Sequence, residues 1–258
     1  MDNENSIQAV DRALQMLLAF QAERPELSVS DFARLLGVHK STASRLAATL
    51  ARRGFLTQEP ATKAFRLGPE VGRLGLLVEG ARDLIALSQD VMERLAQQTG
   101  ETVNLAVLDG DEVVNLAQVD GPHIVGVGNW AGRRTKAHCT SNGKVLLAFS
   151  GAKIHGPLEA FTRQTITNVP ELQAHLEKVR RKGWATNVGE LEEGLHSVGA
   201  PIFDGGNRCV GAFTVAGPSY RVPARRLPEL AQLCRGAAQE VSVRLGAPAQ
   251  PRPKLRKA

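Results

Sequence analysis

The chain has 258 residues, of which 43% are hydrophobic and 22% charged, enough for a small domain and a medium one. It starts with no charged-then-apolar leader and has no apolar run of membrane-spanning length, so a cytoplasmic protein with no membrane partner is expected. The three cysteines, Cys139, Cys209 and Cys234, are widely spaced and form no CxxC pair, which excludes a disulfide framework and a zinc finger.

The first periodic segment, residues 7–20, predicts a helix. Its apolar residues recur at helical spacing and form one stripe. We expect this stripe to pack behind the two helices that follow. Its members are Ile7, Val10, Leu14, Leu17 and Leu18.

Residues 27–68 predict a helix-turn-helix followed by a β-hairpin. Phe32 to Leu36 have helical periodicity, Gly37 can supply the positive φ of a tight turn, and a second helix is expected over residues 39–53. Ser28 or Ser30 is the expected N-cap of the first helix. After Gly54 the pattern alternates, with a polar tip at residues 58–63, as in the wing of a winged helix.

The charge of this segment points to nucleic acid. Between Lys40 and Arg66 there are six cations against the single Glu59, a local balance of +5 in a chain of net charge +6 and pI about 9.5. Arg52 and Arg53 lie at a helix C-terminus, where the helix dipole also favours cations, so for them both explanations stay open. The predicted DNA contacts, with Thr42 and Arg45 nearest the bases, are Ser30, Lys40, Ser41, Thr42, Ser44, Arg45, Lys63 and Arg66.

A helix starting at Pro69 and continuing through Ile85 is expected to link this domain to the next. Leu74, Leu76, Leu77 and Val78 are more apolar than a solvated connector requires, which suggests a dimer contact. At the other end of the chain, residues 247–258 are basic and interrupted by prolines, and they are expected to form a disordered tail.

The second half of the chain predicts an α+β domain. An amphipathic helix is expected over residues 84–98, and further helices over 142–149, 170–183 and 224–245. Strands are expected over residues 102–108, 112–119, 124–127, 197–203 and 210–215. The Asp109-Gly110 step between two alternating runs is a strong hairpin signal.

Three other kinds of chemistry were weighed. Residues 141–145 resemble a phosphate loop, but His138 stands where Gly is needed and Val145 where Ser or Thr is needed. Cys139 beside His138 suggests a cysteine-dependent enzyme, although adjacent residues on an expected strand point to opposite faces. His138, Cys139, His196 and Cys209 have no spacing typical of a metal site. A ligand-sensing or scaffolding module whose DNA-binding domain has decayed is the remaining alternative.

Three separated motifs, together with the winged helix, resemble the IclR family of bacterial transcription regulators. They are HCTSNGKVLLA at 138–148, EEGLHSVGAPIFD at 192–204 and TVAGP at 214–218, and the similarity covers about residues 7–245. The resemblance implies a winged helix-turn-helix domain at 1–68, a linker helix at 69–82 and a GAF-like effector domain with an antiparallel sheet at 83–246. It also implies a homodimer, or a tetramer built from two dimers, on a partly palindromic operator.

The same resemblance implies a regulator that is not an enzyme and uses no cofactor or metal. Repression is the expected activity and activation the alternative, under control of a small carboxylate or aromatic acid. Ala216 stands where relatives often have Ser. Ser141 and Asn142 can equally be a helix cap, and Trp130 can be a pocket wall or a core residue. The effector-binding residues implied are Ser141, Asn142, Asn187, Ser197, Thr214 and Trp130.

Overall fold

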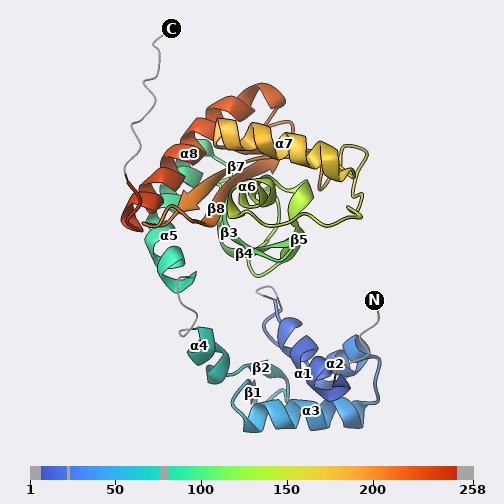
Figure 1. Ribbon diagram of the computed structural model, residues 1–258. Coiled ribbons are helices and arrows are strands. Elements are labelled where there is room, and N and C mark those ends of the chain that lie inside the picture. The colour runs from blue at the N-terminus through green and yellow to red at the C-terminus, as the bar shows by residue number, and fades with distance from the viewer. Residues whose placement is uncertain (1–6, 22–23, 76–80, 249–258) are drawn as a thin grey trace. The chain divides into compact units, whose positions relative to one another are not determined.

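A computed structural model describes residues 7–21, 24–75 and 81–248. The chain divides into two compact units between Arg82 and Asp83 (Figure 1), and each unit is described by itself. None of the described helices is both long enough and apolar enough to cross a membrane.

The N-terminal unit is a helix-turn-helix with a wing. Gly37 ends α2 in the left-handed region, at φ 61°, and His39 caps α3. The wing is a two-stranded antiparallel hairpin in which Leu56 faces Leu67. The elements are α1 (Gln8–Leu18), α2 (Val29–Leu36), α3 (Lys40–Arg52), β1 (Leu56–Gln58), β2 (Phe65–Leu67) and α4 (Pro69–Gly75).

The core of this unit is built around Phe32. Its ring centroid lies 5.9 Å from that of Phe20 and 6.1 Å from that of Phe65, so α2 is joined to both α1 and the wing. Ala43 and Ala47 are fully buried on the inner face of α3. Because both side chains are small, α3 can approach α2 closely while its opposite face remains in solvent.

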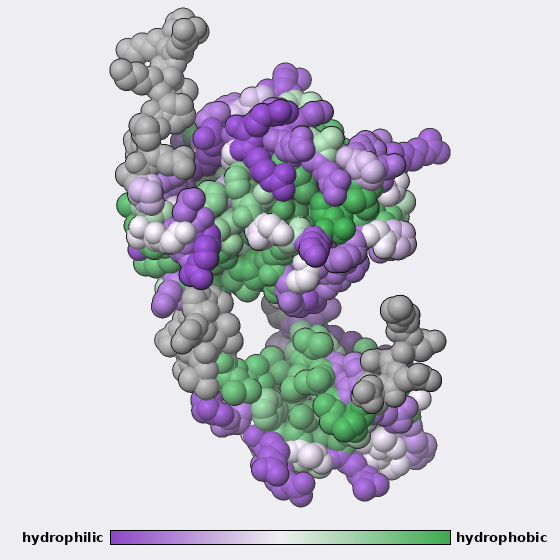
Figure 2. All heavy atoms as spheres, viewed as in Figure 1, coloured by the Kyte–Doolittle hydropathy of each residue, from purple (hydrophilic) through white to green (hydrophobic). Residues whose placement is uncertain are grey.

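The predicted inward stripe of α1 is wrong. Met16 is the fully buried residue of this helix and Leu17 packs beside it, whereas Ile7, Val10, Leu14 and Leu18 are exposed. Figure 2 shows a green, hydrophobic area on the N-terminal unit where Figure 1 draws α1. The helix therefore packs through a neighbouring face and leaves four large apolar side chains without a partner among the described residues.

The C-terminal unit is built on one six-stranded antiparallel sheet with strand order β5-β4-β3-β8-β7-β6. Its helices are α5 (Ala81–Thr99), α6 (Ser141–Ser150), α7 (Val169–Lys182) and α8 (Leu227–Arg244), with short 3-10 helices η1 (Ala137–Cys139) and η2 (Ala224–Arg226). Its strands are β3 (Thr102–Asp109), β4 (Glu112–Val119), β5 (Arg134–Lys136), β6 (Ala185–Val188), β7 (Leu195–Phe203) and β8 (Cys209–Pro218).

The two faces of the sheet are covered differently. Side chains such as Val103, Leu105 and Phe213 form one apolar cluster with α5 and α8. The opposite face, which carries Ala106 and Ala212, packs against α6, and α7 packs on α6 in the same cluster (Figure 1). The predicted α+β class is therefore confirmed. An antiparallel series of strands with helices at either end predicts a sheet with one face covered, and this part of the prediction is wrong, because helices cover both faces.

Two predictions about strands need correction, and two strands were not predicted. Residues 124–127 lie in the loop between β4 and β5, with Ile124 and Val125 exposed, because Pro122, Gly126 and Gly128 interrupt the apolar run. Strands β5 and β6 are not among the predicted ones; β5 pairs with β4 on the side opposite β3, and β6 pairs with β7. His138 and Cys139 lie in η1 and not on a strand. Of the two expected caps of α2, Ser28 is the one observed.

The predicted linker lies partly outside the described residues. Helix α4 ends at Gly75 and α5 begins at Ala81, so Leu76, Leu77 and Val78 fall in the range that is not described, and Leu74 is exposed. Most of the predicted tail, residues 249–258, also lies outside the described residues.

Ser28→Ala should lower the free energy of unfolding of the N-terminal unit by about 1 kcal/mol, because it removes the cap of α2. Hydrogen bonds from the hydroxyl and backbone of Ser28 lower the pKa of Asp31 from 3.8 to about 2. The stabilisation linked to ionised Asp31 is thus present above about pH 4 and lost as the pH falls towards about 2.

Denaturation followed by circular dichroism at neutral pH and near pH 2 measures this effect, and the gap between wild type and Ser28→Ala should narrow in acid. Trp130 and Trp184 both lie in the C-terminal unit, so the fluorescence transition is the internal control and should not change. A gap of the same size at both pH values would contradict the role of Asp31.

Candidate functional site

The exposed face of α3 carries a row of polar side chains. Ala43 and Ala47 are buried on the opposite face, and this fixes the direction in which the rest of the helix points. The backbone N–H of Ser41 donates to Nδ1 of His39 over 3.3 Å, which caps the helix. In Figure 2 purple, hydrophilic residues gather along the edge of the N-terminal unit where Figure 1 draws α3. The exposed residues of its first half are Lys40, Ser41, Thr42, Ser44 and Arg45.

Most cations of this unit's α3 and wing are free to meet an anion. Among the described residues, no ion-pair partner is found for Lys40, Arg45, Arg52, Arg53 or Lys63. Arg66 differs from them, because it is ion-paired with Glu26.

The wing and the start of α2 place the remaining predicted contacts differently. Lys63 is exposed at the wing tip, where its φ of 59° is in the left-handed region. Ser30 lies half-buried in the first turn of α2. The structure thus places five of the predicted contacts on α3 and one, Lys63, at the wing tip. Arg66 is paired with Glu26, and Ser30 lies on α2, away from the α3 residues.

A second candidate site lies on the α6 side of the C-terminal sheet. It is a cavity of about 40 Å³, and all six strands contribute to its wall. None of the residues that line it is ionisable. They are Asn104, Asn115, Val127, Trp130, Thr135, Thr140, Ser141, Asn142, Asn187, Leu191, Leu195, Ser197, Thr214 and Ala216. All six effector-binding residues suggested by the sequence therefore surround one cavity, and Asn104, Asn115, Thr135 and Thr140 are additions to them.

The N-terminus of α6 lies directly on the sheet at one side of the cavity. A Cβ atom at Gly199 would be 2.8 Å from the carbonyl carbon of Ser141 and 2.9 Å from the nitrogen of Asn142, so only glycine allows this approach. Thr140 caps α6 by accepting from the N–H of Gly143. The N–H groups of Ser141 and Asn142 remain at the positive end of the helix dipole beside the cavity.

Hydrogen bonds fix several of the lining side chains. The hydroxyls of Ser141 and Ser197 are 2.8 Å apart. Oδ1 of Asn187 accepts from the N–H of Glu190, which leaves its Nδ2 group available to donate. Glu190 is in turn held by Lys144 at 2.5 Å, a pair in which both side chains are almost completely buried. This ion pair ties the strand end that carries Asn187 to α6.

Other polar atoms of the wall lack partners. Among the described residues, five buried side-chain atoms have no hydrogen-bond partner, and three of them line this cavity. These three atoms are Oδ1 of Asn104, Oγ1 of Thr135 and Oγ1 of Thr214. Burying such a group without a partner costs on the order of 1–3 kcal/mol, so their concentration in one cavity indicates a place built for a bound molecule.

The loop between β4 and β5 closes the cavity through Val127 and Trp130. Gln118 holds this loop in place, since its Nε2 donates to the carbonyl of Gly128 over 2.9 Å and its Oε1 accepts from the N–H of Trp130 over 2.8 Å. The indole N–H of Trp130 donates to the carbonyl of Val127. Trp130 is therefore a wall residue whose polar group is satisfied within the loop.

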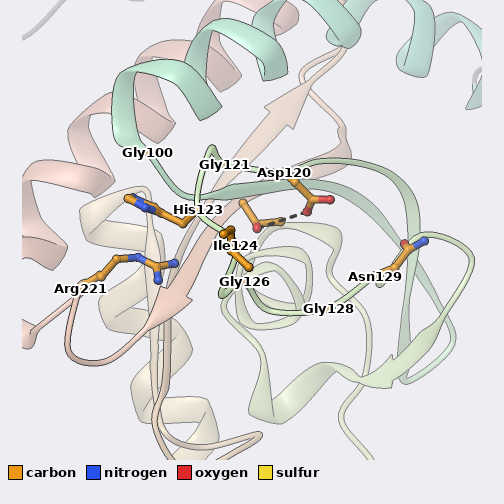
Figure 3. A pocket seen from close by; sticks show the side chains of 10 residues that line it. Gly100, Asp120, Gly121, His123, Ile124, Gly126, Gly128, Asn129 and Arg221 are labelled. Atoms are coloured by element: carbon orange, nitrogen blue, oxygen red, sulfur yellow. Dashed lines mark hydrogen bonds between the residues drawn. The ribbon is translucent and has the colours of Figure 1, made fainter.

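The same loop borders a second hollow of about 230 Å³, shown in Figure 3 with Asp120, Ile124, Asn129 and Arg221 around it. The guanidinium of Arg221 is already engaged by buried Glu101 and by the carbonyl of Val125. Because none of the unpartnered buried atoms belongs to a residue that lines this hollow, we assign it no ligand.

The other chemistries weighed from the sequence find no support in the geometry. Burial raises the pKa of the Cys139 thiol to about 12, so it is protonated and not a nucleophile. Lys144 is fully buried against Glu190 and cannot reach a phosphate. His138 and His196 each contact a backbone carbonyl at 2.8 Å, and within the described ranges no three His, Cys, Asp or Glu residues are placed to hold a metal.

Comparison with known proteins places both sites in one family. Residues 9–60 match the IclR helix-turn-helix domain, and residues 78–243 match the bacterial transcriptional regulator IclR C-terminal domain. The chain belongs to the IclR family. It is therefore a transcriptional regulator with a helix-turn-helix DNA-binding domain and an effector-binding domain, and not an enzyme.

Relatives of this IclR-family chain resemble it over nearly their whole length. The transcriptional regulator XynR of Escherichia coli K12 is 32% identical over 249 residues, 94% of this chain and 99% of its own. The transcriptional repressor AllR of the same organism is 28% identical, over 96% of this chain and 94% of its own. An IclR homologue from Microbacterium hydrocarbonoxydans, solved with 4-hydroxybenzoate, has a TM-score of 0.78 and 25% identity, covering 92% of this chain and 98% of that one.

Thr214→Val should raise the melting temperature of the unliganded protein by roughly 2–4 °C, because it removes an unpartnered hydroxyl without changing the shape of the side chain. The control is Ser88→Ala, which removes another unpartnered buried hydroxyl, from α5, outside the cavity. Both variants should be at least as stable as wild type by thermal denaturation. A loss of several degrees in Thr214→Val alone would show that its hydroxyl is satisfied in the free protein.

Proposed function

We propose that the protein is a repressor that binds a partly palindromic operator as a homodimer, or as a tetramer of two dimers, and responds to a small organic acid. Residues 1–68 read the DNA, 69–82 connect the units, 83–246 bind the effector and 247–258 add positive charge. The observation that carries the proposal is the exposed face of α3, where Arg45 has no ion-pair partner among the described residues. Relatives named as repressors support the sign of regulation.

In this proposal α3 enters the major groove, with Thr42 and Arg45 nearest the bases. Lys40, Ser41 and Ser44 contact the backbone from the same helix, and Lys63 contacts phosphate from the wing. Arg66 joins them by exchanging Glu26 for phosphate, and Ser30 contacts the backbone from the first turn of α2. An exposed ion pair contributes at most about 1 kcal/mol, so replacing Glu26 by a phosphate as the partner of Arg66 costs little free energy.

Exposed apolar residues support the homodimer. Ile7, Val10, Leu14 and Leu18 occupy one side of α1, and all four are more than half exposed. A palindromic operator requires two recognition helices related by a twofold axis, so a self-complementary apolar surface near the DNA-binding elements is what such a dimer needs.

Arg45→Ala should reduce discrimination between operator and unrelated DNA by roughly 1–3 kcal/mol, because a base contact is lost. Lys63→Gln should weaken binding to all sequences about equally and reduce the salt dependence, because a phosphate contact is lost. Gel-shift titrations on the chain's own upstream region and on a scrambled duplex, at several salt concentrations, separate the two effects. Wild-type discrimination in Arg45→Ala would refute the docking, and no DNA binding at all, there or in a random-site selection, would refute the regulator.

The cavity in the C-terminal unit is the proposed effector site, formed by Ser141, Asn142, Asn187, Ser197, Thr214 and Trp130. The homologue solved with 4-hydroxybenzoate supports a small organic acid as the ligand. The α6 N-terminus suits its carboxylate, because free N–H groups and the helix dipole both favour negative charge there. Ligand binding can shift operator affinity only as far as the ligand prefers one arrangement of the dimer.

Trp130 should report on this cavity, because its indole forms part of the wall. In a Trp184→Phe variant it is the single tryptophan of the chain, and its fluorescence should change on titration with an effector that also alters operator binding. The response should disappear in a variant that also carries Asn187→Ala, Ser197→Ala and Thr214→Ala. If that variant still responds to effector at the operator like wild type, the effector binds elsewhere.

A further inference from the structure

The unpartnered atoms of the cavity define what its ligand must carry. Oδ1 of Asn104 can only accept a hydrogen bond, and Asn104 is 5% exposed. A carboxylate has no hydrogen to give it, so a simple carboxylic acid in its ionised form leaves this atom unsatisfied. The ligand must therefore bring an O–H or N–H donor to β3.

The absence of charge in the cavity wall favours an O–H donor over a charged N–H donor. Since no carboxylate lines the cavity, nothing there would compensate a buried ammonium group. A neutral hydroxyl carries no such penalty, and it can also accept from a threonine hydroxyl while it donates to Asn104. Oγ1 of Thr214, which faces Asn104 on the neighbouring strand β8, is the hydroxyl available for this.

The positions of these groups determine where the carboxylate and the hydroxyl of the ligand would lie. Asn104 faces Thr214 directly across the β3–β8 pair, and Thr214 faces Gly199 across the β8–β7 pair. Gly199 is where the backbone of Ser141 and Asn142 lies on the sheet. A carboxylate at the α6 N-terminus and a hydroxyl at Asn104 are thus separated by about two strand spacings, roughly 10 Å between the backbones. Side chains reaching inward from both ends shorten that gap to the length of a small molecule.

The size of the cavity limits the ligand further. At about 40 Å³ it is far below the roughly 300–1,000 Å³ that is usual for small-molecule pockets. This favours a short aliphatic chain over an aromatic ring.

We propose that the effector cavity takes a short-chain hydroxy acid, and that Asn104, supported by Thr214, selects it by accepting a hydrogen bond from its hydroxyl. This inference rests on the proposed effector site and adds the ligand class and two specificity-determining residues. Sites that hydrogen-bond a ligand hydroxyl reject the analogue lacking it strongly, because their own polar groups are then left unpaired.

Calorimetry on the full-length protein without DNA tests the proposal with matched pairs: glycolate with acetate, lactate with propionate, and 4-hydroxybenzoate with benzoate. At least one short hydroxy acid should bind about tenfold or more tightly than its deoxy partner. Asn104→Ala should abolish that preference and Thr214→Val should weaken it, while Ser88→Ala, which removes an unpartnered hydroxyl outside the cavity, should keep it. Circular dichroism establishes that each variant is folded.

Three results would overturn the proposal: no binding by either short hydroxy acid, equal binding within the short pairs, or a preference that survives in folded Asn104→Ala and Thr214→Val. A hydroxyl preference confined to the aromatic pair would also overturn it, because the ligand would not be a short chain. Gel shifts with the same wild-type preparation test DNA binding separately. If the protein prefers the hydroxy acid but binds no operator, this inference stands and the proposed regulator is refuted. If it binds the operator but shows no preference for the hydroxy acid, the regulator stands and this inference is refuted.

Discussion

The C-terminal unit depends on the close approach of the α6 N-terminus to β7 at Gly199. With any side chain at this position the helix would have to move off the sheet, because a Cβ atom would lie within 3 Å of the backbone of Ser141 and Asn142. Along its length α6 packs on the part of the sheet that carries Ala106, Ala212 and their apolar neighbours. At its N-terminus the strands carry polar residues that line the cavity instead, namely Asn104, Thr214, Ser197 and Asn187. The cavity exists because the helix starts where it does.

The wall of the cavity combines ordered and unpartnered polar groups. Lys144 and Glu190 form a buried ion pair, and the backbone N–H of Glu190 fixes Oδ1 of Asn187. The loop with Trp130 is held by Gln118 and not by the cavity's own polar atoms. Ser141, Ser197 and Asn187 are therefore ordered by hydrogen bonds, whereas Asn104, Thr135 and Thr214 each keep an unpartnered oxygen. A wall organised in this way loses little on binding, because it needs little reordering.

The sequence predicts the N-terminal unit well because its signals are local. The turn at Gly37 and the hairpin after Gly54 each follow from a few adjacent residues. The stripe of α1 was misjudged because periodicity shows that a helix has an apolar side but not which side packs, and here Met16 takes the inner position. For Arg66 the partner, Glu26, is forty residues away and no local pattern indicates it.

The cavity wall was only half predictable for a related reason. The resemblance supplied Ser141, Asn187 and Ser197, but Asn104 and Asn115 alternate with apolar neighbours exactly as solvent-facing strand residues do. Asn115 and Gln118 are three residues apart and would face opposite sides of a regular strand. A bulge opposite Leu105 and Ala106 brings both to the cavity face, since Asn115 pairs with Ala106 and Gln118 with Asn104. Only the register of the sheet reveals this.

The unpartnered atoms of the cavity also bear on how a small ligand controls a distant output. Each of these three atoms costs the free protein on the order of 1–3 kcal/mol, so satisfying even one of them is comparable with a typical coupling free energy. A ligand that satisfies them gains that energy, whereas a molecule of similar size without the matching donor does not. If the cavity opens or closes with the arrangement of the dimer, the same hydrogen bonds that select the ligand also bias that arrangement. The selectivity for the ligand and the effect of the ligand on operator binding would then come from the same hydrogen bonds. Removing the acceptor of Asn104 would reduce both.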